Sequence, residues 1–240
     1  MSLIRGTRSS SRPLRAAVGT LALLLSLGSL SACAEEAPFL PAAKVDAPAS
    51  SDHETVVFAG GCFWGVQAVF EHVKGVIRAT SGYAGGNADT AQYERVSMGD
   101  TGHAESVKVE FNPHVVSYGE LLRIYFSVAT NPTELNYQGP DSGTQYRSEI
   151  FFTTPAQQKV AQAYIQQLGH AKAFSDPIVT QLGALKGFYP AEEYHQDYAL
   201  LHPDNPYIAI NDLPKVYNLK HLYPADYSDK PVTVMAHSGE

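Results

Sequence analysis

Hydrophobic positions alternate or recur at helical spacing over residues 54–201, a pattern that predicts one α+β domain. The strand expected at 104–111 is the clearest, because apolar residues occupy every second position from Val107 to Phe111. Apolar residues from Phe63 to Val73 follow helical spacing, directly after an apolar strand at 55–59 and Gly60-Gly61. Further elements are expected as strands at 76–83, 149–152 and 178–182, and as helices at 117–128, 154–168 and 191–201.

This order of elements predicts a two-layer sandwich, with a mostly antiparallel mixed sheet and packed helices around a ferredoxin-like βαβ core. Gly169 is expected to stop the helix at 154–168. Beyond about Pro206 the chain has many prolines and tyrosines and little periodicity, so we expect a long irregular C-terminal wrap. The catalytic domain is placed at 54–226, and residues 227–240 are expected to form a disordered tail.

The amino-terminal 53 residues follow a different pattern. Four arginines precede the apolar run 16–30, which is too short for a comfortable membrane span. The run ends in Leu30-Ser31-Ala32-Cys33, which resembles a bacterial lipoprotein processing box. We therefore expect a lipoprotein signal peptide at 1–32, lipidation of Cys33, and a lipid-anchored flexible tether at 33–53. An ordinary signal peptide that leaves Cys33 free is the alternative.

Charge and the expected anchor narrow the range of partners and locations. The net charge is −7, and the chain after the leader carries 13 basic against 24 acidic residues. An acidic domain argues against a nucleic-acid partner, which would require a clustered basic surface. Because Ala34 follows Cys33, we expect an exported protein anchored in the outer membrane and facing the periplasm.

Cys62 is the candidate nucleophile. It lies between Gly60-Gly61 and the predicted helix, where unpaired amides and the helix dipole favour the thiolate. Phe63 and Trp64 cannot both face the core, so one would form an aromatic wall suited to a small apolar group such as a methyl. A buried structural cysteine is the alternative, because cysteine is among the most buried residue types.

Five motifs follow one another between about residues 55 and 210. They are Gly61-Cys62-Phe63-Trp64, Gly82-Tyr83-Ala84-Gly85-Gly86, Thr101-Gly102-His103-Ala104-Glu105, Gly143-Thr144-Gln145-Tyr146-Arg147-Ser148 and Tyr194-His195-Gln196-Asp197-Tyr198. In this order they resemble peptide methionine sulfoxide reductases of the A type. The resemblance implies an enzyme that reduces methionine sulfoxide, with the S epimer expected, free or in proteins, and that repairs oxidised proteins without a bound cofactor.

The resemblance also implies catalytic roles. Cys62 would attack the sulfoxide sulfur, Glu105 would protonate its oxygen, and Tyr93 and Tyr146 would donate hydrogen bonds to that oxygen. A carboxylic acid stays protonated near neutral pH where an apolar or tyrosine-lined site raises its pKa. Taken alone, Glu105 reads as a surface charge at a strand start, and the tyrosines read as packing residues.

Substrate binding is implied for three residues. Phe63 and Trp64 would form the methyl pocket, and Asp141 would help to hold the substrate and its backbone. Asp141 also fits a turn or helix cap, and both roles are compatible.

The cysteine count predicts how the enzyme is recycled. Many relatives carry a resolving cysteine after an Asn-Pro-x-x-Tyr segment, whereas Asn205-Pro206-Tyr207 is followed here by Ile208, and no cysteine occurs beyond residue 62. The sulfenic acid left on Cys62 would therefore need an external thiol, such as a thioredoxin-like or glutaredoxin-like partner. Asn131 and Tyr137 also depart from the family pattern. A monomer is expected.

Two other functions stay open. A cysteine hydrolase would pair Cys62 with His103 or His195, although both histidines also fit structural roles. A lipid-anchored binding module would keep Cys62 buried and unreactive. Glu192 and His195 have a spacing that allows metal binding, but no second cluster lies nearby in sequence, so no metal is expected.

Overall fold

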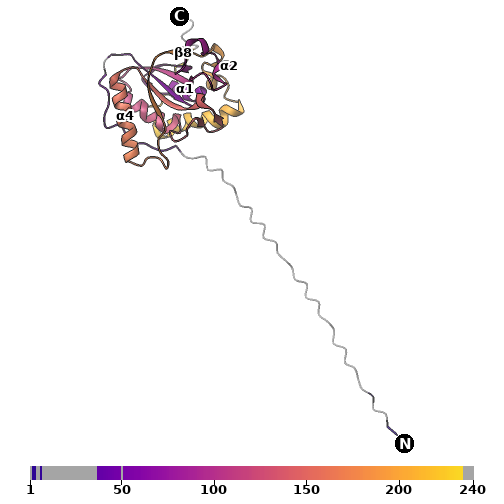
Figure 1. Ribbon diagram of the computed structural model, residues 1–240. Helices are drawn as coiled ribbons and strands as arrows, with labels where there is room; N and C mark the ends of the chain where they lie inside the picture. The colour runs from indigo at the N-terminus through magenta and orange to yellow at the C-terminus, as the bar shows by residue number, and fades with distance from the viewer. Residues whose placement is uncertain (1, 4–5, 7–36, 50, 235–240) are drawn as a thin grey trace. The chain divides into compact units, whose positions relative to one another are not determined.

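The computed structural model of the 240-residue chain describes residues 2–3, 6, 37–49 and 51–234. Contacts divide the chain into a unit of Met1–Glu36 and a unit of Ala37–Glu240, and the second unit holds the sheet and helices (Figure 1). Cys33 lies outside the described residues, as does nearly all of the expected signal peptide. No helix in the described part of the chain is long and apolar enough to span a membrane.

A six-stranded sheet runs through the second unit in the order β7-β6-β1-β3-β2-β8. The neighbours are antiparallel except β6 and β7, which are parallel. A separate ribbon pairs β4 (Tyr137–Gln138) with β5 (Asp141–Ser142). The strands of the sheet are β1 (Glu54–Gly60), β2 (Val76–Ala84), β3 (Ala104–Phe111), β6 (Ser148–Phe152), β7 (Gln181–Ala184) and β8 (Phe188–Pro190).

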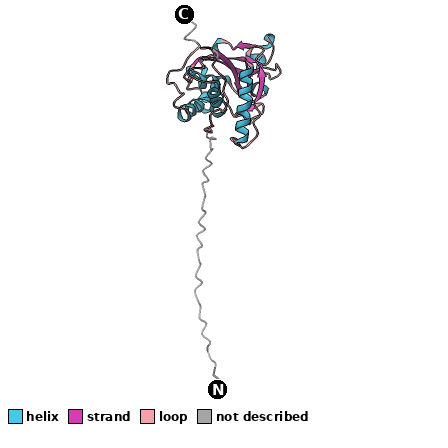
Figure 2. Ribbon diagram, turned by 90° about the vertical axis from the view of Figure 1, so that its left-hand side faces the viewer, coloured by secondary structure: helices cyan, strands magenta, loops and turns pink. Residues whose placement is uncertain are grey.

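The longer helices contribute side chains to one main core on one face of the sheet (Figure 2). Alternation along β1 sends Val56 and Phe58 into this core, and Val57 and Ala59 into a smaller cluster on the opposite face. The longer helices are α1 (Phe63–Glu71), α3 (Tyr118–Ile124), α4 (Pro155–His170) and α6 (Leu213–Leu222). Shorter helical segments are η1 (Ala88–Thr90), α2 (Tyr93–Val96), η2 (Tyr125–Ala129), η3 (Thr144–Tyr146), η4 (Glu193–His195), α5 (Tyr198–Leu201) and η5 (Ile208–Asp212).

The predicted α+β sandwich and its βαβ core are confirmed. Both β1 and β2 pair antiparallel with β3, which lies between them, so β1 and β2 run parallel and α1 connects them. This is a βαβ unit split by a third strand. The same arrangement carries the end of β1 directly into α1 at Cys62.

Several predicted boundaries were wrong. The helix that begins at Phe63 ends at Glu71, and β7 lies three residues beyond the start expected for it. Gly169 does not stop α4, which continues to His170. The helix expected at 191–201 is broken, because Asp197 has a left-handed backbone with φ 55° between η4 and α5. Strand β8 was not predicted.

The C-terminal segment is more ordered than the sequence predicts. Residues 208–222 form η5 and α6, where the long irregular wrap was expected. Residues 227–234 are packed rather than a disordered tail, since Ser228 N donates to His72 O at 2.7 Å and Val232 N donates to Glu71 O at 2.9 Å. Residues 235–240 lie outside the described residues.

Part of the expected tether also belongs to the folded unit. Leu40 is 1% exposed and joins the main core. Arg123 Nε donates to Leu40 O at 2.7 Å, Tyr164 Oη donates to Pro41 O at 2.7 Å, and Lys44 N donates to Gln167 Oε1 at 2.9 Å. Packing of the folded unit therefore begins near residue 37, within the segment expected to be a flexible tether.

Candidate active site

Cys62 lies where β1 ends and α1 begins. It is the N-cap residue of α1, and its side chain is buried. Gly61 precedes it with φ +93°, and a Cβ at Gly61 would lie 2.6 Å from Gln138 Cβ. Only glycine meets both conditions, so the chain can turn sharply from the strand into the helix beside Gln138.

The surroundings of Cys62 favour the neutral thiol. Burial raises the pKa of Cys62 well above its usual range, and the negative charges of Glu105 and Asp212 raise it further. The hydrogen bond from the Trp64 backbone amide and the charge of Lys215 lower this pKa, but by less. The first turn of α1 thus favours the thiolate as expected, but burial and the two carboxylates outweigh this effect.

Glu105 lies near the start of β3, 3% exposed. Its Oε2 accepts a hydrogen bond from Phe63 N at 3.1 Å, which joins β3 to the first turn of α1. Burial raises the pKa of Glu105 to about 8, against the lowering effect of that hydrogen bond. The carboxyl group is therefore mostly protonated at neutral pH and can donate a proton.

Two phenols approach this pair from other segments. Tyr93 begins α2 and Tyr146 ends η3, and both side chains are half-buried. Burial raises the pKa of each phenol, and the charges of Glu105 and Cys62 raise both further. Both tyrosines therefore remain protonated hydrogen-bond donors near the carboxyl group and the thiol.

The aromatic pair that follows Cys62 divides between core and surface. Phe63 is buried, whereas Trp64 is only partly buried and stacks on Tyr198 with ring centroids 4.0 Å apart. Trp64 Nε1 donates to His195 Nδ1 at 3.1 Å. The indole is thus fixed by stacking and by a hydrogen bond, two residues after Cys62 in the chain.

Asp141, in β5, is tied to a residue that the sequence analysis left out of the site. Its Oδ2 accepts a hydrogen bond from Tyr207 Oη. The Tyr207 ring packs edge-on to Trp64, with centroids 6.0 Å apart, and the charge of Cys62 contributes to raising the pKa of Tyr207. The Asn205-Pro206-Tyr207 segment was the sequence signal that could have identified Tyr207 as a site residue. Asn205 helps to fix Tyr207, since Asn205 Oδ1 accepts a hydrogen bond from Tyr207 N at 2.9 Å.

An acid and a lysine from the C-terminal helices also reach the site. Asp212 is fully buried, and its Oδ1 lies 3.5 Å from Lys215 Nζ. A Cβ at Gly65 would lie 2.1 Å from Asp212 Oδ1, so the pair packs directly on the first turn of α1. The local sequence gave no signal beyond the i, i+3 spacing, because the partner element α1 is about 150 residues away in the chain.

The two histidines do not act on the thiol. His103 Nδ1 accepts from Gly86 N at 3.2 Å, and its Nε2 lies 2.9 Å from Asn87 O. His195 holds Trp64, and burial lowers the pKa of His195, so the imidazole is neutral. Within residues 51–234 neither ring is hydrogen-bonded to Cys62, and both have other partners, so the arrangement does not favour a cysteine hydrolase.

Glu192 has structural partners of its own. Its Oε2 accepts from Tyr83 Oη at 2.9 Å, and its Oε1 accepts from Tyr93 N at 3.0 Å. It thereby positions the first turn of α2. Among the described residues no group of three or more His, Cys, Asp or Glu side chains is arranged to hold a metal ion.

Comparison with known proteins agrees with this geometry. Residues 54–226 match the family model described as peptide methionine sulfoxide reductase. The chain belongs to this family. This makes it a peptide methionine sulfoxide reductase, an oxidoreductase that reduces methionine sulfoxide.

Relatives and solved structures extend the match. The reductase is 60% identical over 194 residues to peptide methionine sulfoxide reductase MsrA 2 of Mesorhizobium japonicum, covering 81% of this chain and 100% of that protein. It is 52% identical over 177 residues to MsrA 2 of a Synechocystis strain, covering 74% and 81%.

Two solved structures share the fold of the reductase. The reduced form of Mxr1 from Saccharomyces cerevisiae is 32% identical with a TM-score of 0.56, covering 68% of this chain and 91% of that one. Methionine sulfoxide reductase A of Corynebacterium diphtheriae is 31% identical with a TM-score of 0.54, covering 64% and 77%.

Proposed function

We propose that the reductase uses Cys62 as nucleophile and Glu105 as proton donor. The observation that carries this proposal is their meeting at the first turn of α1, where Phe63 N donates to Glu105 directly beside the buried Cys62. The reacting acid and thiol are both neutral at rest, and such a pair suits a neutral sulfoxide.

The first half-reaction transfers oxygen to the enzyme. The sulfoxide oxygen accepts hydrogen bonds from Glu105, Tyr93 and Tyr146, which polarises the sulfur–oxygen bond without adding charge. The sulfur of Cys62 attacks the sulfoxide sulfur while Glu105 protonates the oxygen, and the thiol proton restores Glu105. The hydroxyl group then moves from the substrate sulfur to the Cys62 sulfur as the new sulfur–sulfur bond breaks, which releases the methionine thioether and leaves Cys62 as a sulfenic acid. Cysteine is oxidised by two electrons and the substrate is reduced by two.

Substrate selection rests on Trp64 and Asp141. The stacked indole gives the S-methyl group an apolar surface, with Phe63 behind it in the core. Asp141 accepts a hydrogen bond from Tyr207, and in this proposal it also accepts hydrogen bonds from the amino acid or peptide backbone of the substrate. The S epimer is the expected substrate because of the family resemblance.

The second half-reaction uses an external thiol. The chain has only two cysteines, Cys33 and Cys62, and Ile208, at the resolving position, is fully buried. One thiol attacks the sulfenic sulfur of Cys62, which releases water and forms a mixed disulfide between that thiol and Cys62. A second thiol then attacks the first thiol's sulfur and releases Cys62 as a free thiol. A thioredoxin-like or glutaredoxin-like protein fits this role. No bound cofactor takes part in either half.

The leader sequence supports a location in the cell envelope. Acylation of Cys33 after removal of residues 1–32 would anchor a monomer to the membrane, with the domain facing the periplasm. The proposed task is the repair of oxidised envelope proteins.

Turnover by matched cysteine variants tests the assignment. We expect Cys62→Ser to abolish reduction of methionine sulfoxide with dithiothreitol as reductant, while Cys33→Ser retains it, and only the S epimer to be consumed. Methionine formation would be measured by chromatography. Turnover by Cys62→Ser at the rate of Cys33→Ser would refute the proposal.

A further inference from the structure

The sheet leaves a gap beside the active site. β1 lies between β3 and β6, but it ends at Gly60, where the chain turns into α1. The last pairs are Ala59 with Ser106 on one side and Gly60 with Ser148 on the other. Residues just before those positions on β3 and β6 therefore have no strand between them.

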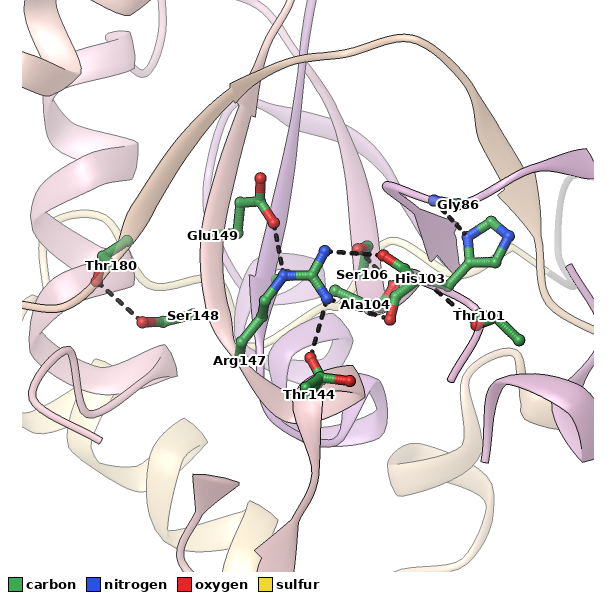
Figure 3. A network of polar contacts seen from close by, with 12 residues as sticks. Gly86, Thr101, His103, Ala104, Ser106, Thr144, Arg147, Ser148, Glu149 and Thr180 are labelled. Carbon is green, nitrogen blue, oxygen red and sulfur yellow. Dashed lines mark hydrogen bonds and ion pairs between the residues drawn. The ribbon is translucent and has the colours of Figure 1, made fainter. Parts of the chain in front are cut away.

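Arg147 fills this gap with its side chain (Figure 3). Its Nη1 donates to His103 O at 3.2 Å and to Thr144 O at 2.9 Å, and its Nη2 donates to Gly102 O at 3.1 Å. These carbonyls belong to the loop before β3 and to η3. The guanidinium thus replaces the backbone hydrogen bonds that a longer β1 would have supplied.

The two segments joined by Arg147 carry two of the proposed oxygen-binding groups. Glu105 follows His103 by two residues, and Tyr146 directly precedes Arg147. On one side of β3, Glu105 pairs with Tyr83 of β2. On the other side, where η3 lies, Arg147 connects the segment of Glu105 to that of Tyr146. A shift between these segments would separate the acid from the phenol.

The guanidinium is itself held rigidly. Arg147 Nε donates to Glu149 Oε2 at 2.7 Å, and the two side chains are 12% and 11% exposed. A partly buried, charge-assisted pair keeps its geometry better than a surface pair. The planar fork of arginine can address three carbonyls and a carboxylate together, which the ammonium of lysine cannot.

We propose that Arg147 is a positioning residue that sets the spacing between Glu105 and Tyr146, so that both reach the same sulfoxide oxygen. The proposal rests on the mechanism above. Arg147 does not contact the substrate in this proposal. The Arg147–Glu149 pair supports catalysis by holding the geometry of the site, and it also stabilises the fold.

Arg123 provides a matched control. It is 14% exposed, its Nε donates to Leu40 O at 2.7 Å, and its Nη1 contacts Glu120 at 3.2 Å, all away from Cys62. Arg123→Met removes a comparable buried guanidinium at another place in the fold. It therefore separates the general effect of removing a buried arginine from the specific effect of removing Arg147.

The test measures kcat and KM for methionine sulfoxide with dithiothreitol. Because a misplacement of about 1 Å can cost about a hundredfold in rate, we expect Arg147→Met to lower kcat by about that factor with little change in KM. In Arg147→Met, the rate at which iodoacetamide alkylates Cys62 should stay within about twofold of the wild-type rate. The kcat of Arg123→Met should also stay within about twofold of wild type. Arg147→Lys should show an intermediate loss.

Two further measurements exclude a merely structural role. The Glu105→Gln/Arg147→Met double variant should lose less than the product of the two single losses, because both changes act through the same acid. Arg147 also borders a cavity of about 680 Å³ with Thr144, Glu149 and Gly102. Added guanidinium ion should therefore restore part of the activity of Arg147→Ala, whereas urea should not.

Wild-type kcat in Arg147→Met, an equal loss in Arg123→Met, or fully multiplicative losses in the double variant would each overturn the inference. If Arg147→Met fails to fold, Arg147→Lys and Glu149→Gln carry the test, because each weakens the contacts without emptying the site. If one of these results is found and Cys62→Ser is inactive, only the positioning role of Arg147 is refuted. Turnover by Cys62→Ser would refute the mechanism itself.

Discussion

At the scale of single residues, the site depends on two buried groups that both hold their protons. Cys62 and Glu105 each have a raised pKa, and for both the largest cause is burial. Each ionised partner would raise the pKa of the other, so the neutral pair is the favoured resting state. In the proposed mechanism, the substrate oxygen receives a proton that Glu105 already holds.

The pKa of Glu105 makes the reaction sensitive to alkaline pH. Because the protonated acid is the active form and its pKa is about 8, kcat/KM for methionine sulfoxide should fall as pH rises through about 8. Glu105→Gln should be slower by about 10²–10⁴-fold and should lack this fall, because an amide donates a hydrogen bond but no proton. Steady-state rates between pH 6 and pH 10, with the reductant kept saturating, would measure both.

Stability provides an independent check on the same group. The folded-state pKa of Glu105 lies above its unfolded value, so its protonation stabilises the fold at low pH and this contribution is lost as pH rises through about 8. Urea unfolding should therefore show Glu105→Gln losing less stability than wild type between about pH 5 and pH 8. An equal loss would contradict the raised pKa.

At the scale of elements, sequence patterns predicted the parts that depend on local order. β3 was predicted to the residue because its alternation reflects one buried face. The helix expected from residue 117 also begins there, since Ser117 Oγ caps α3 by accepting from Glu120 N at 3.2 Å. α6 was missed because its periodicity is weak, although Pro214 in its first turn is compatible with a helix.

The site residues divide in the same way. The motifs led to Cys62, Glu105 and Trp64, because each lies in a distinctive string. Asp212 and Lys215 escaped notice because their importance comes from a tertiary contact with Gly65. The sign of the shift in the pKa of Cys62 was missed because its largest cause is burial in the folded chain, to which the charges of Glu105 and Asp212 add.

The segment at 37–47 is an element without regular secondary structure, and we expect it to stabilise the domain. Leu40→Ala should lower the free energy of unfolding by about 2–5 kcal/mol, because it leaves a cavity in the main core. Val45→Ala, at a position 44% exposed, should change it by less than about 0.5 kcal/mol. Urea denaturation would measure both. Equal effects would mean that the segment does not pack as described.

At the scale of the whole molecule, the C-terminal part of the chain closes the site. η5 and α6 bring Asp212 and Lys215 to α1, and Ile208 is buried in a small cluster with Ala68 and Ala199. In relatives that recycle internally this region carries the resolving cysteine, whereas here it supplies packing and charge. Under the proposed mechanism, the enzyme stops after one oxygen transfer until an outside thiol reduces Cys62.

A single-turnover experiment without reductant tests this central claim most directly. Enzyme carrying Cys33→Ser would be mixed with excess methionine S-sulfoxide, and methionine would be counted against enzyme while dimedone traps any sulfenic acid for mass spectrometry. The account predicts one methionine per enzyme, a single dimedone adduct on Cys62, and renewed turnover only after a thiol is added. Repeated turnover without thiol, or an adduct on any residue other than Cys62, would contradict it.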